Sequence, residues 1–401
     1  MVAGPGLIVM EADNDAGAVS TYVQAGAQYG TRLLWILLLL LPITYFTQEM
    51  VVRLGIATGK GHAAMIYQRF GKWWGLFSLV DLQFVNFLTL VTEFAAISLA
   101  LGKMGVSPYA AVPSSAVAMI GLVFTGSYLR WERTVIFLCL LDLAWFWIAC
   151  LSRPPVVSLI RDAMVPGVPA GGLSSPLVFL VIGIVGTTIA PWQLFFQQSC
   201  IADKRLRFSD LKWARLDTFL GACFTIGIAG CMMVLGDFAR KNGIPFSDPA
   251  QMAADLAGII GPVASNVILL LMVNAAVLGT TAISLSSAWA YGEAKGWPHS
   301  LQLPFREATG FYAIYAGCVL LAAAVVLIPR APLQLIILSV QVLAGLMLPS
   351  AIIFLQLLLN DHEVLDQEFS NTKWNNRVNW TIIAVLFLLS VVLAAQVILG
   401  L

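Results

Sequence analysis

Eleven apolar runs, each about long enough to cross a bilayer, constrain this chain more than any other feature. A helix needs about 20 apolar residues to cross about 30 Å of hydrocarbon, because it rises about 1.5 Å per residue. The runs lie at residues 1–30, 32–52, 75–101, 112–128, 133–151, 177–199, 217–236, 263–291, 308–328, 333–358 and 378–399. With 59% hydrophobic and 11% charged residues, the composition is that of a membrane protein. We therefore predict an all-α polytopic protein, with one transmembrane domain of about eleven helices over residues 1–401.

Basic residues divide unevenly between the two sets of loops. Of the 22 Lys and Arg residues, fifteen lie in or beside the loops that follow even-numbered runs. The positive-inside rule places these loops and the N-terminus in the cytoplasm. The first run has no basic n-region and no cleavage site, so we do not interpret it as a signal peptide. We expect an integral protein of a bacterial inner membrane.

Two of the runs carry residues that weaken a helix in mid-span. The first contains "EADNDAG" at residues 11–17, and the sixth contains Gly186, Thr187, Thr188 and Pro191. Broken helices five apart are typical of a 5 + 5 inverted repeat, in which the unwound segments meet near the midplane and bind substrate and ions. We therefore predict that helices 1 and 6 are broken and face each other, with helix 11 as an addition. The alternative is that Pro191 merely kinks a packed helix.

Six carboxyl groups fall inside the predicted spans, where an ionised group costs about 2.5 to 3.5 kcal/mol on insertion scales. They belong to Glu11, Asp13, Asp15, Glu49, Glu93 and Asp142. No Lys or Arg lies in the interior of a span, so we expect protons or a cation to neutralise these groups. An unwound turn can present Asp13 and Asp15 to one space, and oxygen ligands suit hard divalent cations. For Glu49, Glu93 and Asp142 the alternative is a protonated acid that hydrogen-bonds a neighbouring helix.

Enzymatic chemistry has little support in the sequence. There is no nucleotide-binding loop and no nucleophile–base pair, and His62, His299 and His362 all fall in predicted loops. Asp13 and Asp15 share one segment, whereas an intramembrane aspartyl protease needs two carboxyl groups that face each other. We expect a protein that is not an enzyme and has no cofactor, nucleic-acid partner or obligate protein partner. Its expected partners are a divalent cation and the lipid bilayer.

Three stretches resemble one family: "GPGLIVM", "GAQYGTRLLWILLLLLPITYFTQEMVVRLGIATGK" and "TTIAPWQLFFQQS". They are similar to the NRAMP divalent metal transporters, and the resemblance covers residues 4–61 and recurs around 182–200 and 335–361. It implies a LeuT-like fold with a metal site built from an Asp-Pro-Gly-Asn motif in helix 1 and a Met-Pro-His motif in helix 6. Here the first motif reads Asp15-Ala16-Gly17-Ala18 and the second reads Ala190-Pro191-Trp192.

The departures from these motifs favour a harder ion. A Met thioether favours transition metals, so Ala190 in its place removes the discrimination against Mg²⁺. The chain thus resembles the NRAMP-related magnesium transporters, and Mg²⁺ usually keeps several waters. The resemblance implies a site for Mg²⁺ or Mn²⁺, as transported substrate, from Asp15, Asp13, Asn14, Thr187 through its carbonyl, Gln341, and positions Ala190 and Ala18.

Proton coupling is expected to be absent. The family pairs an Asp and a Glu in helix 3 and has histidines in helix 6, whereas this chain has Glu93 with Ala96, and Trp192 with Gln197. We therefore predict uncoupled transport of Mg²⁺, and of Mn²⁺, by alternating access. The alternatives are a proton-coupled transporter of Mn²⁺ and transition metals, a LeuT-like amino-acid carrier, and a scaffold or receptor that has lost transport. Acids at the break would repel the carboxylate of an amino acid.

Overall fold

The computed structural model describes residues 4–169, 172, 174–328 and 332–399, and these residues form helices and loops without strands. The first half contains α1 (Pro5–Ala12), α2 (Ala16–Tyr29), η1 (Gly30–Leu33), α3 (Leu34–Thr58), α4 (His62–Phe70), α5 (Lys72–Lys103), α6 (Pro108–Val123), α7 (Tyr128–Leu141), α8 (Ala144–Leu151) and α9 (Val156–Met164). The second half contains α10 (Ser175–Thr188), α11 (Pro191–Lys204), η2 (Phe208–Asp210), α12 (Leu211–Lys241), α13 (Pro249–Ile260), α14 (Pro262–Lys295), α15 (Thr309–Val326), α16 (Leu333–Leu358) and α17 (Lys373–Leu399).

Many helices of the described chain are long enough to cross a membrane. Among the described residues, nine helical stretches are long and apolar enough to cross a membrane, and the first of them, Ala16–Thr58, includes both α2 and α3. The shorter helix α6 is also apolar. Each predicted apolar run therefore lies on a helix or a pair of helices, and the all-α polytopic fold is confirmed.

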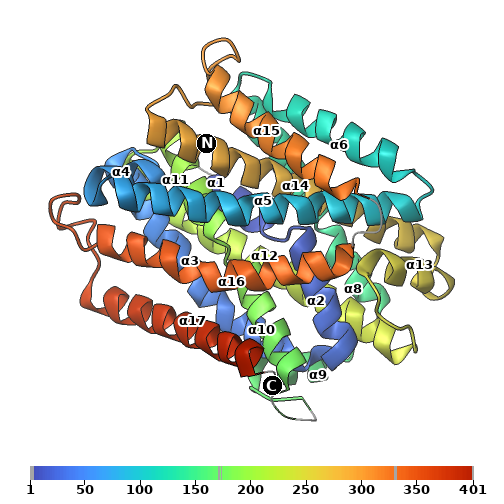
Figure 1. The fold of residues 1–401 in the computed structure, drawn as a ribbon. Helices are drawn as coiled ribbons and strands as arrows, with labels where there is room; N and C mark the ends of the chain where they lie inside the picture. Colours follow the sequence, from blue (N-terminus) through green and yellow to red (C-terminus); the bar gives the residue numbers. More distant parts are fainter. Residues whose placement is uncertain (1–3, 170–171, 173, 329–331, 400–401) are drawn as a thin grey trace.

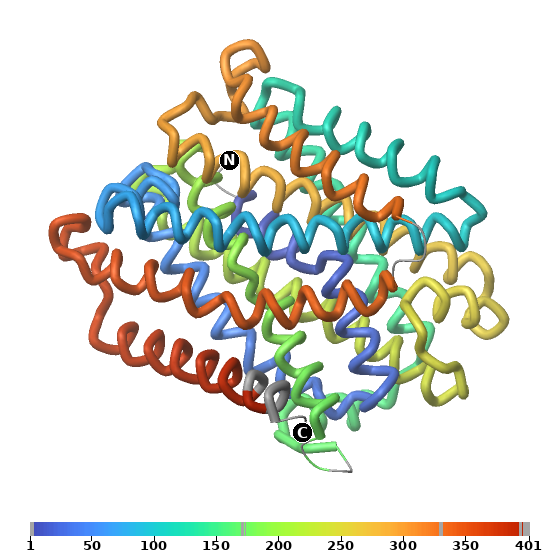
Figure 2. Tube along the Cα trace, viewed as in Figure 1, coloured from blue at the N-terminus to red at the C-terminus, as the bar shows by residue number. Residues whose placement is uncertain are grey.

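The paired helices α1 and α2 lie in the interior of the bundle. Figure 1 shows α5, α14 and α16 lengthwise across the molecule, with α6 and α15 at one edge and α17 at the opposite edge. In Figure 2 the dark-blue N-terminal segment runs through the middle of the trace. Helix α12 packs against both α1 and α2, and every residue from Ala16 to Val23 is buried. The segment rich in carboxyl groups is thus enclosed by other helices.

The break between α1 and α2 is where the sequence predicts it. Helix α1 ends at Ala12, and α2 begins at Ala16. Asp and Asn side chains compete for backbone hydrogen bonds and disfavour helix interiors, but they are good N-caps. Asp15 has extended backbone and accepts a hydrogen bond from the Ala18 amide at 2.8 Å, so it caps α2.

The break between α10 and α11 follows from Pro191. Proline lacks an N–H and pushes the preceding residue out of the helical region, and Ala190 is accordingly extended (φ −99°, ψ 147°). Ile189 is extended as well. Pro191 then occupies the first turn of α11, where a missing N–H costs nothing. The interpretation of Pro191 as a mere kink is therefore wrong.

A further interruption lies in the fifth predicted span, which the sequence reading treats as one helix. Helix α7 ends at Leu141 and α8 begins at Ala144, with Asp142 and Leu143 between them. The Asp142 N–H donates to the Cys139 carbonyl at 3.2 Å, an i→i−3 bond of the 3₁₀ type in place of the α-helical i→i−4 bond. An acidic residue therefore sits at this break, as it does at the break of the first span.

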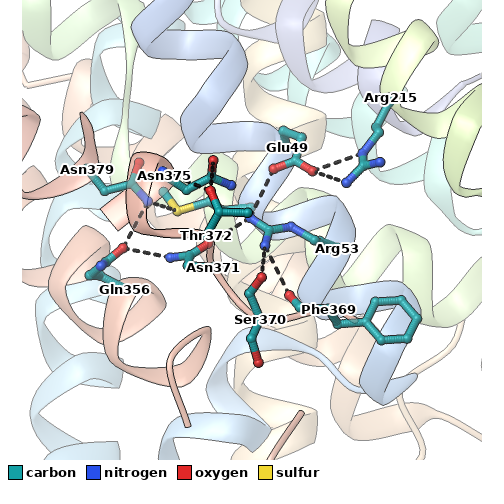
Figure 3. A network of polar contacts seen from close by, with 11 residues as sticks. Glu49, Arg53, Arg215, Gln356, Phe369, Ser370, Asn371, Thr372, Asn375 and Asn379 are labelled. Carbon is teal, nitrogen blue, oxygen red and sulfur yellow. Dashed lines mark hydrogen bonds and ion pairs between the residues drawn. The ribbon is translucent and has the colours of Figure 1, made fainter. Parts of the chain in front are cut away.

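The expectation that acids in the spans lack a basic partner is wrong for Glu49. Glu49 in α3 accepts hydrogen bonds from Arg53 at 3.1 Å and from Arg215 of α12 at 2.7 Å (Figure 3). The reason is that residues i and i+4 share a helix face, so Arg53, just beyond the apolar run, points back along α3. Arg53 also donates to the carbonyls of Phe369 and Ser370, which fastens the segment before α17 to α3.

Candidate functional site

The two predicted breaks meet inside the protein. Tyr22 of α2 and Thr188 of α10 share a hydrogen bond of 2.7 Å. Helix α16 lies against both helices, and its Gln341 packs on Gly17 of α2 and Gly186 of α10. The structure therefore places the unwound segments beside each other, as a 5 + 5 inverted repeat requires.

Asp15 lies at this meeting point beside a second carboxyl group. One oxygen of Asp15 accepts from the Ala18 amide, and Oε2 of Glu93 in α5 accepts from the Ala16 amide at 3.1 Å. The side chains of Asp15 and Glu93 are close enough to interact directly. Gly279 of α14 allows this arrangement, because an added Cβ would lie 2.9 Å from the Asp15 Cβ and 3.0 Å from Glu93 Oε2.

Several buried oxygen atoms around the breaks have no hydrogen-bond partner. They are both carboxyl oxygens of Asp13, Oε1 of Glu93 and the hydroxyl of Thr187. A buried polar group without a partner costs about 1–3 kcal/mol. Asp13 also lies within electrostatic range of Asp15. Oxygen atoms of this kind are the ligands that Mg²⁺ and Mn²⁺ take, so a cation would satisfy groups that the protein leaves unpaired.

Asn14 is directed to a different part of the interior. Its amide nitrogen donates to the Thr225 carbonyl of α12 at 3.3 Å, and its side chain lies at Glu11. The sequence groups Asn14 with Asp13 and Asp15 as a candidate ligand. The structure instead brings Asn14 together with Glu11.

The alanine positions contribute no side-chain ligand. Ala190 is 5% exposed at the start of α11, and Ala18 is fully buried. Among the described residues, no group of three or more His, Cys, Asp or Glu side chains forms a ready metal-binding cluster. The groups that could bind an ion at the breaks are therefore a few carboxyl oxygens, a hydroxyl, an amide and backbone carbonyls.

Glu93 and His62, near the breaks and between two spans respectively, have contacts that the sequence alone does not indicate. Glu93, one of the six acids inside the predicted spans, reaches the start of α2 next to Asp15, where it accepts a hydrogen bond from the Ala16 amide. His62 lies between two membrane-crossing stretches, as the predicted topology has it, but it begins the short helix α4 and is fully buried. Burial lowers the pKa of His62 to about 4, although its hydrogen bond with Gln198 opposes that shift. His62 is therefore neutral at pH 7.

The absence of a side chain at Gly17 leaves room for Gln341 beside the first break. A Cβ at Gly17 would lie 1.6 Å from Gln341 Nε2. We expect Gly17→Ala to displace the Gln341 amide and weaken uptake of the expected divalent cation by about 1–3 kcal/mol, the usual cost of losing one buried polar partner. Radiometric or dye-based Mg²⁺ uptake into proteoliposomes measures this effect.

Gly317→Ala is the matched control, because nothing lies within 4 Å of a Cβ added at Gly317 in α15. That variant should transport like the unmodified protein. Equal transport by the two variants would show that Gln341 has no part in the site.

Comparisons with known proteins agree with this architecture. A family model described as natural resistance-associated macrophage protein-like, or Nramp, matches residues 6–396. The chain is 27% identical to the divalent metal cation transporter MntH of Ralstonia nicotianae over 415 residues, which cover 99% of this chain and 91% of that protein. It is 24% identical to MntH of Lacticaseibacillus casei over 414 residues, which cover 98% of this chain and 88% of that protein.

Solved structures support the same fold. The manganese transporter of Eremococcus coleocola superposes with a TM-score of 0.79 at 18% identity, covering 98% of this chain and 85% of that one. A Na⁺-coupled sialic acid symporter superposes with a TM-score of 0.60 at 12% identity, covering 95% and 87%. At such identities the likeness concerns the fold alone, and it confirms the predicted LeuT-like arrangement.

Proposed function

This chain belongs to the Nramp family, and from that premise we propose that it is a magnesium transporter that also carries Mn²⁺ and moves no protons. It is a divalent metal cation transporter and not an enzyme. The helices that can cross a membrane make it an integral membrane protein. The family relatives favour a metal ion over the amino acid that a LeuT-like carrier could take. The proposal concerns the choice of ion, the coupling and the placement in the cell.

The single observation that carries the choice of ion is Ala190 at the break between α10 and α11. The residue there has no sulfur to favour soft ions. The groups left without a partner around the breaks, on Asp13, Glu93 and Thr187, are oxygen atoms. Mg²⁺ takes oxygen ligands and keeps some of its waters, so a small residue at position 190 suits it. These features support our proposal that the chain acts like the NRAMP-related magnesium transporters.

We infer that transport is not coupled to protons because residues around the site cannot carry a proton. Ala96 lies one turn after Glu93, and Gln197 donates to the Thr218 hydroxyl at 2.9 Å. Neither Ala96 nor Gln197 can carry a proton. The membrane potential alone is sufficient to drive uptake, because a divalent ion gains about 4.6 kcal/mol from 100 mV, twice the single-charge value.

The test is a flux measurement in proteoliposomes with Mg²⁺ outside and an inside-negative potential. We expect Mg²⁺ and Mn²⁺ uptake that grows with the potential, while a pH dye inside the vesicles reports no acidification. Vesicles that hold Asp15→Ala protein control for leaks of ions and protons. Acidification in proportion to Mn²⁺ uptake would contradict the uncoupled mechanism, and a complete lack of Mg²⁺ uptake beside normal Mn²⁺ uptake would contradict the choice of ion.

The placement in the cell follows from the loops. Arg205, Arg207, Lys212 and Arg215 lie between the sixth and seventh spans, and such basic segments stay in the cytoplasm. We place the N-terminus in the cytoplasm and the protein in a bacterial inner membrane. A fusion reporter at each end of the chain would test this orientation.

A further inference from the structure

A second group of buried oxygen atoms lies at the end of α1 and in the break that follows it. Glu11 belongs to α1, and Asp142 lies at the break between α7 and α8. The two carboxyl groups are within electrostatic range of each other. Glu11 is fully buried and Asp142 is 1% exposed. Neither residue contributes to the site around Asp15.

Each of these carboxyl groups has one oxygen held by a donor and one oxygen without a partner. Thr225 of α12 donates to Oε1 of Glu11 at 2.9 Å, and Asn274 of α14 donates to Oδ1 of Asp142 at 3.0 Å. Oε2 of Glu11 and Oδ2 of Asp142 are buried and have no hydrogen-bond partner. The donors therefore fix both side chains while an oxygen of each stays available.

Asn14 supplies an independent indication of a ligand. It is 1% exposed, its amide nitrogen donates to the Thr225 carbonyl, and its side chain lies at Glu11. Its Oδ1 atom has no partner. All three unpaired atoms, on Glu11, Asn14 and Asp142, are acceptors. One shared proton would pair only some of them, whereas a cation accepts lone pairs from all of them at once.

We propose that Glu11, Asn14 and Asp142 form a second binding site for a divalent cation, with Thr225 and Asn274 as positioning residues. The proposal rests on the proposed function in one respect, since it takes the transported Mg²⁺ or Mn²⁺ as the ligand. Two carboxylates match the charge of such an ion, and the oxygen ligands match its hardness.

The position of this second site gives it a role in transport. Asp13 lies within electrostatic range of both Asp15 and Glu11. An ion that passes from Asp15 to Glu11 thus stays within the field of a carboxylate. The second site is therefore a stopping point for the ion at the end of α1, next to the break that holds Asp15.

The test counts bound ions on the full-length protein in detergent, by equilibrium dialysis with radioactive Mn²⁺. We expect about two ions per chain in the unmodified protein and about one in each of two variants, Glu11→Gln/Asp142→Asn and Asp15→Asn, because each keeps one oxygen-lined site. Asp142→Asn alone preserves the acceptor for Asn274, and it serves if the double variant does not fold. Asp81→Asn is the control, since Asp81 is a half-buried acid of α5 that bonds Ser350.

The possible results separate the two proposals. An unmodified protein that transports Mg²⁺ but binds about one ion, unchanged in Glu11→Gln/Asp142→Asn, overturns the second site alone. A variant that keeps every ion but loses a pH dependence of transport overturns it as well, because the pair then carries a proton. An unmodified protein that neither binds nor transports either ion overturns the proposed function itself.

Discussion

Asp15→Ala and Asp15→Asn are both expected to abolish Mg²⁺ and Mn²⁺ transport, with a loss of at least about 100-fold in rate, or about 2.8 kcal/mol. Asp15 lies where the two broken spans meet, next to Glu93 and within range of Asp13. Removing its negative charge leaves the cation with fewer anionic ligands, and a neutral amide does not replace a carboxylate in a buried site. Proteoliposome uptake measures the effect.

The two substitutions differ in what they do to the fold. Asp15 caps α2 through the Ala18 amide, so alanine also removes an N-cap, which is worth about 1 kcal/mol. Asparagine is as good an N-cap as aspartate. Asp15→Asn should therefore unfold at the temperature of the unmodified protein while it fails to transport. Transport by Asp15→Asn at the normal rate would show that the ion does not bind at this break.

Asp13→Ala is expected to have a smaller effect than either change at Asp15. Neither carboxyl oxygen of Asp13 has a hydrogen-bond partner, so its loss removes charge near the ion without removing a cap. If the ion keeps waters, Asp13 acts through them and the loss of transport is partial. A complete loss would make Asp13 a direct ligand equal to Asp15.

The breaks of helices 1 and 6 could be predicted because their causes are local. Asp and Asn residues in succession, and a proline in mid-span, disfavour the helix whatever surrounds them. The five-span offset then implies that the breaks meet. Tyr22 and Thr188, which bond across the two broken spans, lie where that pattern puts them.

Other parts of the site depend on contacts between distant segments, and no local pattern encodes these. Gln341 reaches the first break because Gly17 and Gly186 leave space for α16. Asn14 turns toward Thr225, 211 residues away in the chain. Arg53 pairs with Glu49 from just beyond the apolar run. Such contacts follow from the packing of whole helices, so the residue types alone do not indicate them.

The proposed preference for Mg²⁺ leads to a specific prediction for a substitution at Ala190. We expect Ala190→Met to reduce Mg²⁺ transport about tenfold, which is about 1.4 kcal/mol, and to preserve or improve the binding of Mn²⁺ and Cd²⁺. A thioether adds affinity for softer ions. Its bulk, at a buried position next to Pro191, also crowds the waters that Mg²⁺ retains.

Ala18→Asn is the matched control for this change, because an amide oxygen distinguishes weakly among these ions and should leave the order of preference as it is. Isothermal titration with Mg²⁺, Mn²⁺ and Cd²⁺ compares the two variants with the unmodified protein. Asp15→Asn, titrated in parallel, reports the ions bound elsewhere. If Ala190→Met binds Mg²⁺ and Cd²⁺ with unchanged affinities, position 190 does not face the ion. The absence of sulfur at the second break then has no bearing on the choice of magnesium.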